Sequence, residues 1–327
     1  MINIELNPIV NLETFDSINR SVGLSGFIRA KNEGEYIYQV ISSWIDLLDE
    51  LIVVFNDCSD NTEYEIKRAI NDFGGKVKAF KYLPKVFAQG SKEHVELPHD
   101  NVHSLVHYYN YALSKTTCKY AVKIDGDIIY DTSATDIIRS YLANSSETDY
   151  FKLHGVNLID NHGELFIPSN SIFCGMNGDL CIFPVSKNNI FKWKKEFEFL
   201  DLSGLSDAGG VFAYYHMKFI KKDMGFSNYL LKDNPQSRYV KITKEFIIRL
   251  RFLSIERTLN KFNITLKLPN TLRIKAKRKR DFKKDYKDEL WNCGIVISSR
   301  DVATYLVMKI VRNMKSRLVS VVKKITS

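Results

Sequence analysis

The sequence lacks the long apolar run of a membrane-spanning segment. It contains no stretch of about 18 consecutive apolar residues, so no transmembrane helix is expected. Residues 1–8 (Met-Ile-Asn-Ile-Glu-Leu-Asn-Pro) also lack a basic region followed by an apolar stretch, so they do not read as a secretory signal. These absences predict a cytoplasmic protein.

Cysteine and histidine are present without the spacing of a metal or disulfide framework. The five cysteines form no Cys-x-x-Cys pair, and their odd number and scatter suit a reducing compartment. Six of the seven histidines show no His-Glu-x-x-His or other ligand spacing. We therefore expect ordinary thiols, and histidines in loops or in the core.

Positive charge is concentrated at the C-terminal end. The chain of 327 residues has a formal net charge of +9. Residues 273–327 contain sixteen Lys or Arg against five Asp or Glu, so the rest of the chain is slightly acidic. A polyanionic partner would therefore be sought at the C-terminal end.

Apolar strands alternate with amphipathic helices over the first 130 residues. The apolar runs predict strands at 24–29, 51–55, 77–80 and 120–124, and apolar positions three or four apart predict helices over 37–48, 66–73 and 103–114. This alternation predicts an α/β fold, with a doubly wound, mostly parallel sheet and helices on both faces. Residues 1–22 show no period, and we expect an irregular lead-in there.

Three polar clusters follow predicted strands, at 29–33, 56–62 and 125–127. Ligands bind beyond the carboxyl ends of the strands in such sheets, so the three clusters should meet at one edge. Asp125 and Asp127 would repel each other unless a cation lay between them. Their oxygen atoms suit Mg²⁺ or Mn²⁺. Taken alone, Asp125-Gly-Asp127 would favour a surface turn, and the preceding hundred residues reverse that preference.

The pattern changes after residue 150. Short apolar runs predict strands over 151–158, 165–167, 171–174 and 180–184, and the aromatic, charged stretch 190–200 predicts a helix. We expect antiparallel strands plus a helix over 150–235. Beyond this point, residues 240–262 read as a helix. Residues 300–325 form an amphipathic helix whose apolar stripe runs from Val302 to Ile325 and whose other side is mostly basic.

Three motifs resemble those of a known family. They are Ser25-Gly-Phe-Ile-Arg-Ala-Lys-Asn-Glu33, Ile52-Val-Val-Phe-Asn-Asp-Cys-Ser-Asp-Asn-Thr62 and Lys123-Ile-Asp-Gly-Asp127. Together they resemble the family 2 glycosyltransferases of the GT-A fold, of the type that builds bacterial surface polysaccharides. The match covers about 24–130. Tyr214-Tyr-His-Met-Lys218 is similar to the C-terminal metal-binding histidine of many GT-A enzymes, and residues beyond about 235 are not covered.

The resemblance implies a metal-dependent, inverting, hexosyltransferase-type enzyme. It would move a sugar from a nucleotide donor, a UDP-sugar, to a hydroxyl of a glycan or lipid-linked acceptor, for a capsule or lipopolysaccharide. It implies Mn²⁺ or Mg²⁺ on Asp125, Asp127 and His216. The residues implied to bind the nucleotide-sugar are Arg29, Lys31, Asn32, Glu33, Asn56, Asp57, Asp60, Lys123, Asp125 and Gly126.

The sequence departs from the family at two points. Asn56 stands where the family usually has Asp against the nucleobase, which leaves the base open. The carboxylate pair that often holds the general base is absent between Asp127 and His216. Asp179 is our first candidate for the base and Glu198 the second, with Glu196, Asp201 and Asp207 also open.

Other functions fit the sequence less well. A nucleotidyltransferase making activated sugars would normally carry a glycine-rich phosphate loop after the first strand, and residues 29–34 are a poor one. A nucleic-acid-binding protein would use the basic end, but aromatic residues are not interleaved there, and no nucleic acid is expected.

Two units are predicted. Residues 1–235 form the catalytic unit, with a nucleotide-sugar half (1–130) and an acceptor half (131–235). Residues 236–327 form a basic helical region. The helix over 300–325 would dock on the catalytic unit, lie on anionic lipid, or do both in part, and we predict peripheral association with the inner face of the cell membrane through 273–327.

Overall fold

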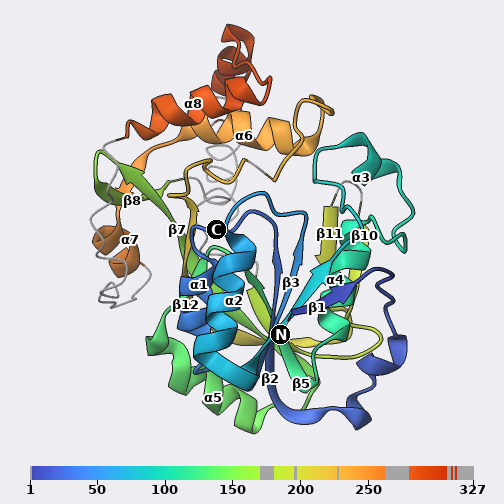
Figure 1. Cartoon of the computed structure of the whole chain (residues 1–327). Coiled ribbons are helices and arrows are strands. Elements are labelled where there is room, and N and C mark those ends of the chain that lie inside the picture. Colours follow the sequence, from blue (N-terminus) through green and yellow to red (C-terminus); the bar gives the residue numbers. More distant parts are fainter. Residues whose placement is uncertain are drawn as a thin grey trace, which may run out of the picture.

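The computed structural model describes residues 2–169, 180–194, 197–226, 228–261 and 280–307, together with residues 311 and 314 (Figure 1). Within these residues, no helix is both long enough and apolar enough to cross a bilayer. The predicted strand 171–174, and most of the predicted helix 300–325, lie outside the described residues.

The first half forms five parallel neighbours of one 11-stranded sheet, in the order β1-β4-β3-β2-β5. The strands are β1 (Ile2–Glu5), β2 (Ser21–Ala30), β3 (Glu50–Asn56), β4 (Val77–Tyr82) and β5 (Cys118–Asp125). The connecting helices are α1 (Ile37–Trp44), α2 (Thr62–Phe73), α3 (Lys92–Glu96) and α4 (Leu105–Ser114). The predicted α/β fold with a mostly parallel sheet is confirmed.

Residues 2–5 correct the expectation of an irregular lead-in. They form β1, which pairs in parallel with β4 at the edge of the sheet. The strand is four residues long, with Ile2 against the core and Ile4 exposed. So short an edge strand shows too little alternation to be recognised without its partner.

The second half extends the sheet in the order β5-β9-β7-β12-β6, with β8 paired to β7. The elements are β6 (Ile128–Tyr130), α5 (Thr135–Asn144), β7 (Asp149–Asn161), β8 (Glu164–Pro168), β9 (Leu180–Pro184) and β12 (Ser206–Phe219). Antiparallel pairing was expected here, and most pairs are antiparallel. The β7–β12 pair is parallel. A parallel pair needs a long connection, and β8 to β11 lie between these two strands in the chain.

The stretch 190–200 is a hairpin, so the prediction of a helix was wrong. β10 (Phe191–Lys194) and β11 (Phe197–Leu200) pair antiparallel and place Trp193 opposite Glu198. Apolar and charged residues alternate with period two in each strand. Phe191 is buried against Tyr109, and Lys192 is exposed. This alternation is the pattern of a half-buried strand.

The region beyond residue 235 packs against the end of the sheet. It contains α6 (Arg238–Arg249), β13 (Phe252–Ser254), α7 (Ile255–Lys261) and α8 (Phe282–Asn292). β13 pairs with β8, so a strand interrupts the predicted helix 240–262. α6 and α8 lie together beyond the edge of the sheet toward which the β3 arrow points (Figure 1). Together with the end of β12, they bury an apolar cluster centred on Phe219, Phe246 and Tyr286.

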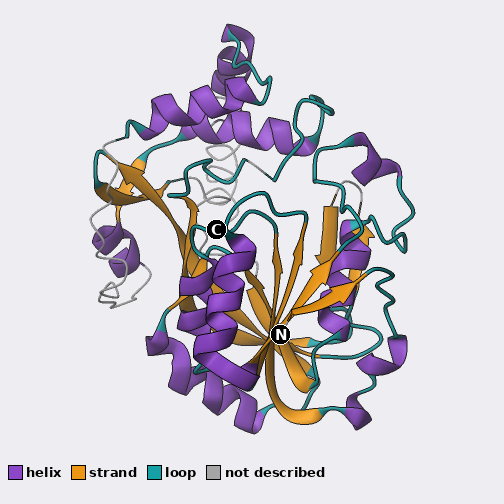
Figure 2. Ribbon diagram, in the orientation of Figure 1, coloured by secondary structure: helices purple, strands orange, loops and turns teal. Residues whose placement is uncertain are grey.

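Helices cover both faces of the sheet, as predicted (Figure 2). On one face, α1 and α2 bury a cluster that includes Trp44, whose indole Nε1 donates to the Ile128 carbonyl over 3.0 Å. On the other face, α4 buries a second cluster that includes Tyr111 and Phe183. The two packed faces hold the strands in register, and this register aligns the loops at their carboxyl ends.

Candidate active site

The polar clusters that follow β2, β3 and β5 lie at one edge of the sheet. β2 pairs with both neighbours so that Arg29 stands opposite Val54 of β3 and Asp125 of β5. The loops that begin after these positions therefore start at the same level. This is the arrangement that the sequence predicted for the three motifs.

Asp127 is the buried carboxylate at the centre of the site. Only 4% of the residue is exposed. Its Oδ1 lies 3.0 Å from His216 Nε2, and its Oδ2 lies 3.0 Å from Lys221 Nζ. Burial alone would raise the pKa of Asp127, but the charges of Lys221 and His216 outweigh burial and hold it well below its usual range. The carboxylate is therefore ionised at neutral pH.

His216 reaches Asp127 because β12 lies beside β6. The antiparallel register sets His216 opposite Ile128, one residue after Asp127. Two residues 89 positions apart in the chain are thus brought into contact. The predicted association of Asp127 with His216 is present in the structure.

Asp125 is more exposed than Asp127 and pairs with a different lysine. Its two oxygens lie 3.0 and 3.1 Å from Lys123 Nζ, two residues earlier in β5. Burial opposes ionisation, but the charges of Lys123, His216 and Arg29 together keep the pKa of Asp125 below its usual value. Asp125 therefore presents a second ionised carboxylate on the same turn.

Lys221 is a site residue that the sequence analysis missed. Its ammonium lies 2.8 and 3.1 Å from the two carboxylate oxygens of Glu33, and it also contacts Asp127. Burial, together with the nearby charge of Asp127, raises the pKa of Glu33 to about 8 despite Lys221. Lys221 belongs to no motif and follows β12 in the sequence without any recognisable pattern. Only the fold brings it beside Glu33, which follows β2, and Asp127, which follows β5.

Gly126 allows two of the loops to approach each other. A Cβ atom at this position would lie 2.6 Å from Glu33 Cγ and 2.9 Å from Glu33 Cβ. Any side chain here would therefore push Glu33 away from Lys221. Close approach of the Glu33 side chain therefore explains the glycine.

The loops after β2 and β3 are fastened to each other. Asp60 accepts hydrogen bonds from the Gly34 amide (2.9 Å) and the Thr62 amide (3.0 Å), and Asn32 Oδ1 accepts from the Ser59 amide (2.8 Å). Lys31 forms a more exposed pair with Asp57 over 2.8 Å. Four of the predicted nucleotide-binding residues thus hold the two loops together in this structure.

Asn56 has its amide group fully engaged with the chain. Its Nδ2 donates to the carbonyls of Tyr82 (2.8 Å) and Pro84 (2.7 Å), and its Oδ1 accepts from the Val86 amide (3.2 Å). The residue is also buried, with 1% exposed. Asn56 therefore fixes the start of the long loop after β4.

Arg29 lies flat on an aromatic side chain within the site. Its guanidinium carbon is 3.1 Å from the centre of the Tyr109 ring. Its buried Nε has no hydrogen-bond partner within the described residues. Burial raises the pKa of Tyr109 to about 12, so the phenol stays neutral. Arg29 is thus oriented by stacking and keeps donors for an anion.

Glu198 lies in β11, and the β10–β11 hairpin packs against Tyr109. Tyr109 stacks on Phe191 of β10 with ring centres 4.3 Å apart, and the charge of Glu198 acts on the Tyr109 hydroxyl. Glu198 Oε2 is buried without a hydrogen-bond partner in the part of the chain that the structure describes. A buried carboxylate oxygen without a partner is costly, and such groups are candidates for a functional role.

The other predicted bases are placed differently. Asp201 pairs with Lys192 over 2.6 Å, and Asp207 pairs with Lys152. Hydrogen bonding from Lys192 lowers the pKa of Asp201 to about 2, which makes it a poor proton acceptor. Asp179 and Glu196 lie outside the described residues.

The donor types at the site suit a divalent cation. Asp125, Asp127 and His216 supply carboxylate oxygen and imidazole nitrogen, which Mn²⁺ and Mg²⁺ accept in different proportions. Within the described residues, no three His, Cys, Asp or Glu side chains are already gathered as a ligand set. Lys123 and Lys221 instead contact the carboxylates. The chemistry of the site therefore fits a metal, while a cationic side chain faces each carboxylate.

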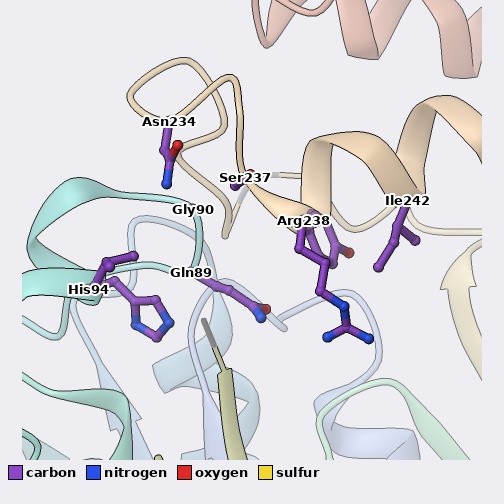
Figure 3. Close-up of a pocket in the computed structure, with 9 residues that line it drawn as sticks. Gln89, Gly90, His94, Asn234, Ser237, Arg238 and Ile242 are labelled. Carbon is purple, nitrogen blue, oxygen red and sulfur yellow. The ribbon is translucent and has the colours of Figure 1, made fainter. Parts of the chain in front are cut away.

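A separate small pocket lies between the long loop after β4 and the start of α6 (Figure 3). Its volume of about 20 Å³ is room for about one water molecule. Gln89, Gly90 and His94 line one side, and Asn234 and Arg238 line the other. No carboxylate of the site lines this pocket, so we do not assign the reaction to it.

A protein-family model matches the part of the chain that carries most of this site. A family model described as "Beta-1,4-N-acetylgalactosaminyltransferase (CgtA)" matches residues 17–202, more than half of the chain. The matched range contains Arg29, Asp125 and Asp127, as well as Glu198. A search of curated proteins finds no match.

Solved structures with partial similarity include mycobacterial proteins. Glucosyl-3-phosphoglycerate synthase from Mycobacterium tuberculosis, in complex with Mg²⁺ and uridine-diphosphate, is 21% identical with a TM-score of 0.28, covering 47% of this chain and 50% of that one. The same enzyme with Mn²⁺, UDP-glucose and phosphoglyceric acid is 21% identical with a TM-score of 0.28, covering 47% and 51%. A structure described as a mycobacterial protein is 21% identical with a TM-score of 0.29, covering 45% of each chain. The chain thus spans about half the length of these structures.

The family match confirms that the resemblance to a glycosyltransferase was correct. It does not extend to the narrower assignments to family 2 or to the synthesis of bacterial surface polysaccharides, which stay predictions. The matched residues include the three strand-end motifs and the β10–β11 hairpin. The chain belongs to the beta-1,4-N-acetylgalactosaminyltransferase (CgtA) family.

Proposed function

We propose that this enzyme is a metal-dependent, inverting glycosyltransferase. It moves a sugar from a UDP-sugar to a hydroxyl group of a glycan or lipid-linked acceptor, of the kind found in capsule or lipopolysaccharide. The description of its family makes N-acetylgalactosamine the first sugar to test. The observation that carries the proposal is the contact of Asp127 with His216 at the strand edge, with the ionised Asp125 on the same turn.

Asp125, Asp127 and His216 are the residues that would hold Mn²⁺ or Mg²⁺. A bound divalent cation stabilises the negative charge that develops on a departing diphosphate. Arg29 adds a fixed cation with free donors, and its planar group suits phosphate oxygens. Lys31 and Lys123, which pair with Asp57 and Asp125 in this structure, would supply two further cations to the diphosphate. Glu33, Asp60 and Asn56 hold the loops that surround the nucleotide.

We propose Glu198 as the general base. Inversion requires one displacement, in which the acceptor hydroxyl attacks the anomeric carbon as the diphosphate leaves. The acceptor loses its proton in that step, and Glu198 Oε2 is a buried carboxylate oxygen without a partner among the described residues. A β-linked product from an α-linked UDP-sugar, as the family description suggests, is consistent with this stereochemistry. Asp179 stays the alternative base.

A donor panel tests the proposal. Purified enzyme is incubated with UDP-N-acetylgalactosamine, UDP-galactose or UDP-glucose and Mn²⁺, and release of UDP is followed with and without candidate glycan acceptors. We expect one donor to be turned over, and the product anomer to be β by NMR. Asp127→Ala should reduce turnover by at least a hundredfold, whereas Asp136→Ala, on the exposed side of α5, should not. Full activity in EDTA would refute the metal, and an α-linked product would refute inversion.

We also propose that the C-terminal region touches anionic lipid. Phe282, Tyr286 and Leu290 of α8 are buried against the rest of the molecule, so this helix docks. Trp291 is 66% exposed and Leu306 is 51% exposed. A shallow groove of about 480 Å³ separates α8 from the segment that follows it.

The lipid is proposed as the occupant because exposed lysines accompany these apolar residues. Lys284 and Lys287 are exposed on α8 beside Trp291, and each lysine near anionic lipid contributes about 1 kcal/mol. The enzyme should sediment with phosphatidylglycerol vesicles at low salt and be released as salt rises. Lys284→Glu with Lys287→Glu should weaken sedimentation, whereas Lys92→Glu with Lys187→Glu should not. Equal sedimentation of both variants would remove the membrane role.

A further inference from the structure

Lys221 is a buried lysine in direct contact with two carboxylates of the site. The residue is 5% exposed. Its Nζ lies 2.8 Å from Glu33 Oε2 and 3.0 Å from Asp127 Oδ2. The ammonium therefore already occupies one side of the carboxylate that our proposed function assigns to the metal.

The fold fixes this lysine from both sides. Its carbonyl accepts from the Arg280 guanidinium (3.2 Å) and from the Met224 amide (3.1 Å), and the next amide, of Lys222, donates to Glu35 Oε2 (3.0 Å). Arg280 comes from the start of the α8 segment, and Glu35 from the loop after β2. The backbone at Lys221 is thus held in place by these contacts, and its side chain is part of the site.

A divalent cation and this ammonium cannot share Asp127 Oδ2 without strong repulsion. Like charges a few ångströms apart repel, and burial weakens the screening of that repulsion. Glu33 offers the ammonium further oxygen acceptors, at 2.8 and 3.1 Å, that the metal does not need. A nucleoside diphosphate brings further oxygens, toward which a released N–H could donate.

We propose that Lys221 competes with the divalent cation for Asp127. When the metal binds, the ammonium leaves Asp127, keeps Glu33, and gains the donor diphosphate as its new partner. The competition makes the empty enzyme a weak metal binder and makes metal and nucleotide bind together. This inference rests on the proposed function in one respect, which is that Asp127 ligates the metal.

Direct measurement of Mn²⁺ binding tests the competition without any turnover. Mn²⁺ is titrated into the full-length wild type and into Lys221→Met, with and without UDP, and free Mn²⁺ is read by electron paramagnetic resonance. We expect Lys221→Met to bind Mn²⁺ at least tenfold more tightly than the wild type when UDP is absent. UDP should then increase Mn²⁺ affinity by a smaller factor in Lys221→Met than in the wild type.

Two variants serve as matched controls. Lys221→Arg keeps the positive charge and should retain weak Mn²⁺ binding. Lys218→Met removes a nearby lysine whose Nζ contacts the hydroxyls of Tyr229 and Tyr239, so it should also bind Mn²⁺ as the wild type does. Unchanged or weaker Mn²⁺ binding by Lys221→Met would overturn the competition.

A second measurement needs no variant and covers the case in which Lys221→Met does not fold. Lysines of the wild type are reductively methylated with and without Mn²⁺, and peptides are analysed by mass spectrometry. Labelling of Lys221 should rise several-fold with Mn²⁺ and fall again when UDP is added, while Lys218 stays unchanged. Constant labelling of Lys221 in saturating Mn²⁺ would overturn the inference.

The two experiments separate this inference from the proposed function. Mn²⁺ that binds equally to the wild type and Lys221→Met leaves the metal site intact and removes only the competition. A wild type that binds no Mn²⁺, even with UDP, would overturn the metal site itself and the inference with it.

Discussion

Asp60 and Asp57 lie three residues apart in the loop after β3, and replacing each by alanine should have very different effects. Asp60 accepts hydrogen bonds from the amides of Gly34 and Thr62, and also from the Thr62 hydroxyl. That hydroxyl in turn accepts from the Glu33 amide (2.7 Å). Asp57 makes an exposed ion pair with Lys31. One aspartate joins two loops, and the other lies at their surface.

The expected loss differs accordingly. A net contribution of about 1 kcal/mol for the helix-start contact with Thr62, and about 1.5–2 kcal/mol for a charged acceptor on the Gly34 amide, gives a loss of about 3 kcal/mol for Asp60→Ala. An exposed ion pair contributes about 0.5 kcal/mol or less, so Asp57→Ala should be nearly neutral. An unfolding entropy of about 2 cal/mol/K per residue makes 1 kcal/mol equal to about 1.5 °C for a chain of 327 residues. Asp60→Ala should therefore melt about 4 °C below the wild type.

Differential scanning calorimetry and urea denaturation of both variants provide the measurement. Asp60→Asn keeps an oxygen acceptor without the charge, so it should fall between Asp60→Ala and the wild type. Equal melting temperatures for Asp60→Ala and Asp57→Ala would refute the assignment of Asp60 as a fastener between loops. The role in binding the nucleotide that was predicted from the sequence would then be the better explanation.

Three further variants test other parts of the structure. Glu198→Gln should lower turnover by about a hundredfold with donor KM unchanged, as measured by UDP release. Glu50 accepts hydrogen bonds from Lys78 and others that outweigh burial and lower its pKa, so its stabilisation is present above the unfolded pKa of about 4.3 and lost below it. Glu50→Gln should therefore cost about 1.5 kcal/mol at pH 7, because the partner Lys78 is half exposed, and the gap to the wild type should close as pH falls toward 3 in urea denaturation. Gly126→Ala should force Glu33 aside and lower Mn²⁺-dependent turnover several-fold.

The parallel half of the fold was predictable because each of its elements carries a local signal. The strand 51–55 is entirely buried, and α1 has its apolar residues three and four apart, so burial and period appear directly in the sequence. α2 ends at Gly74, whose φ of 58° favours glycine. These signals depend only on neighbouring residues in the chain, so the elements could be predicted from the sequence alone.

The errors arose where structure depends on distant partners. β1 exists because β4 pairs with it, and β10 and β11 are a hairpin because Phe191 packs against Tyr109. Lys221 joins the site because β12 lies between β7 and β6. Motif spacing encodes none of these contacts, and only the period-two alternation within β10 and β11 carried a local signal. The carboxylates were found because a recognisable turn carries both of them, whereas Lys221 has no such marker.

The C-terminal region has a closer relation to the reaction than its basic composition suggested. Arg280 holds the carbonyl of Lys221, and Phe282 and Tyr286 pack on Phe219 at the end of the strand that carries His216. Removing residues beyond about 270 would therefore expose an apolar cluster and loosen the segment that carries Lys221. Such a truncation would confuse loss of lipid binding with loss of the site, which is why substitutions on exposed lysines are the sounder test. The same contacts mean that a lipid surface bound at α8 would lie close to the open edge of the sheet. The lipid-linked acceptor that we propose would then enter the site without leaving the membrane.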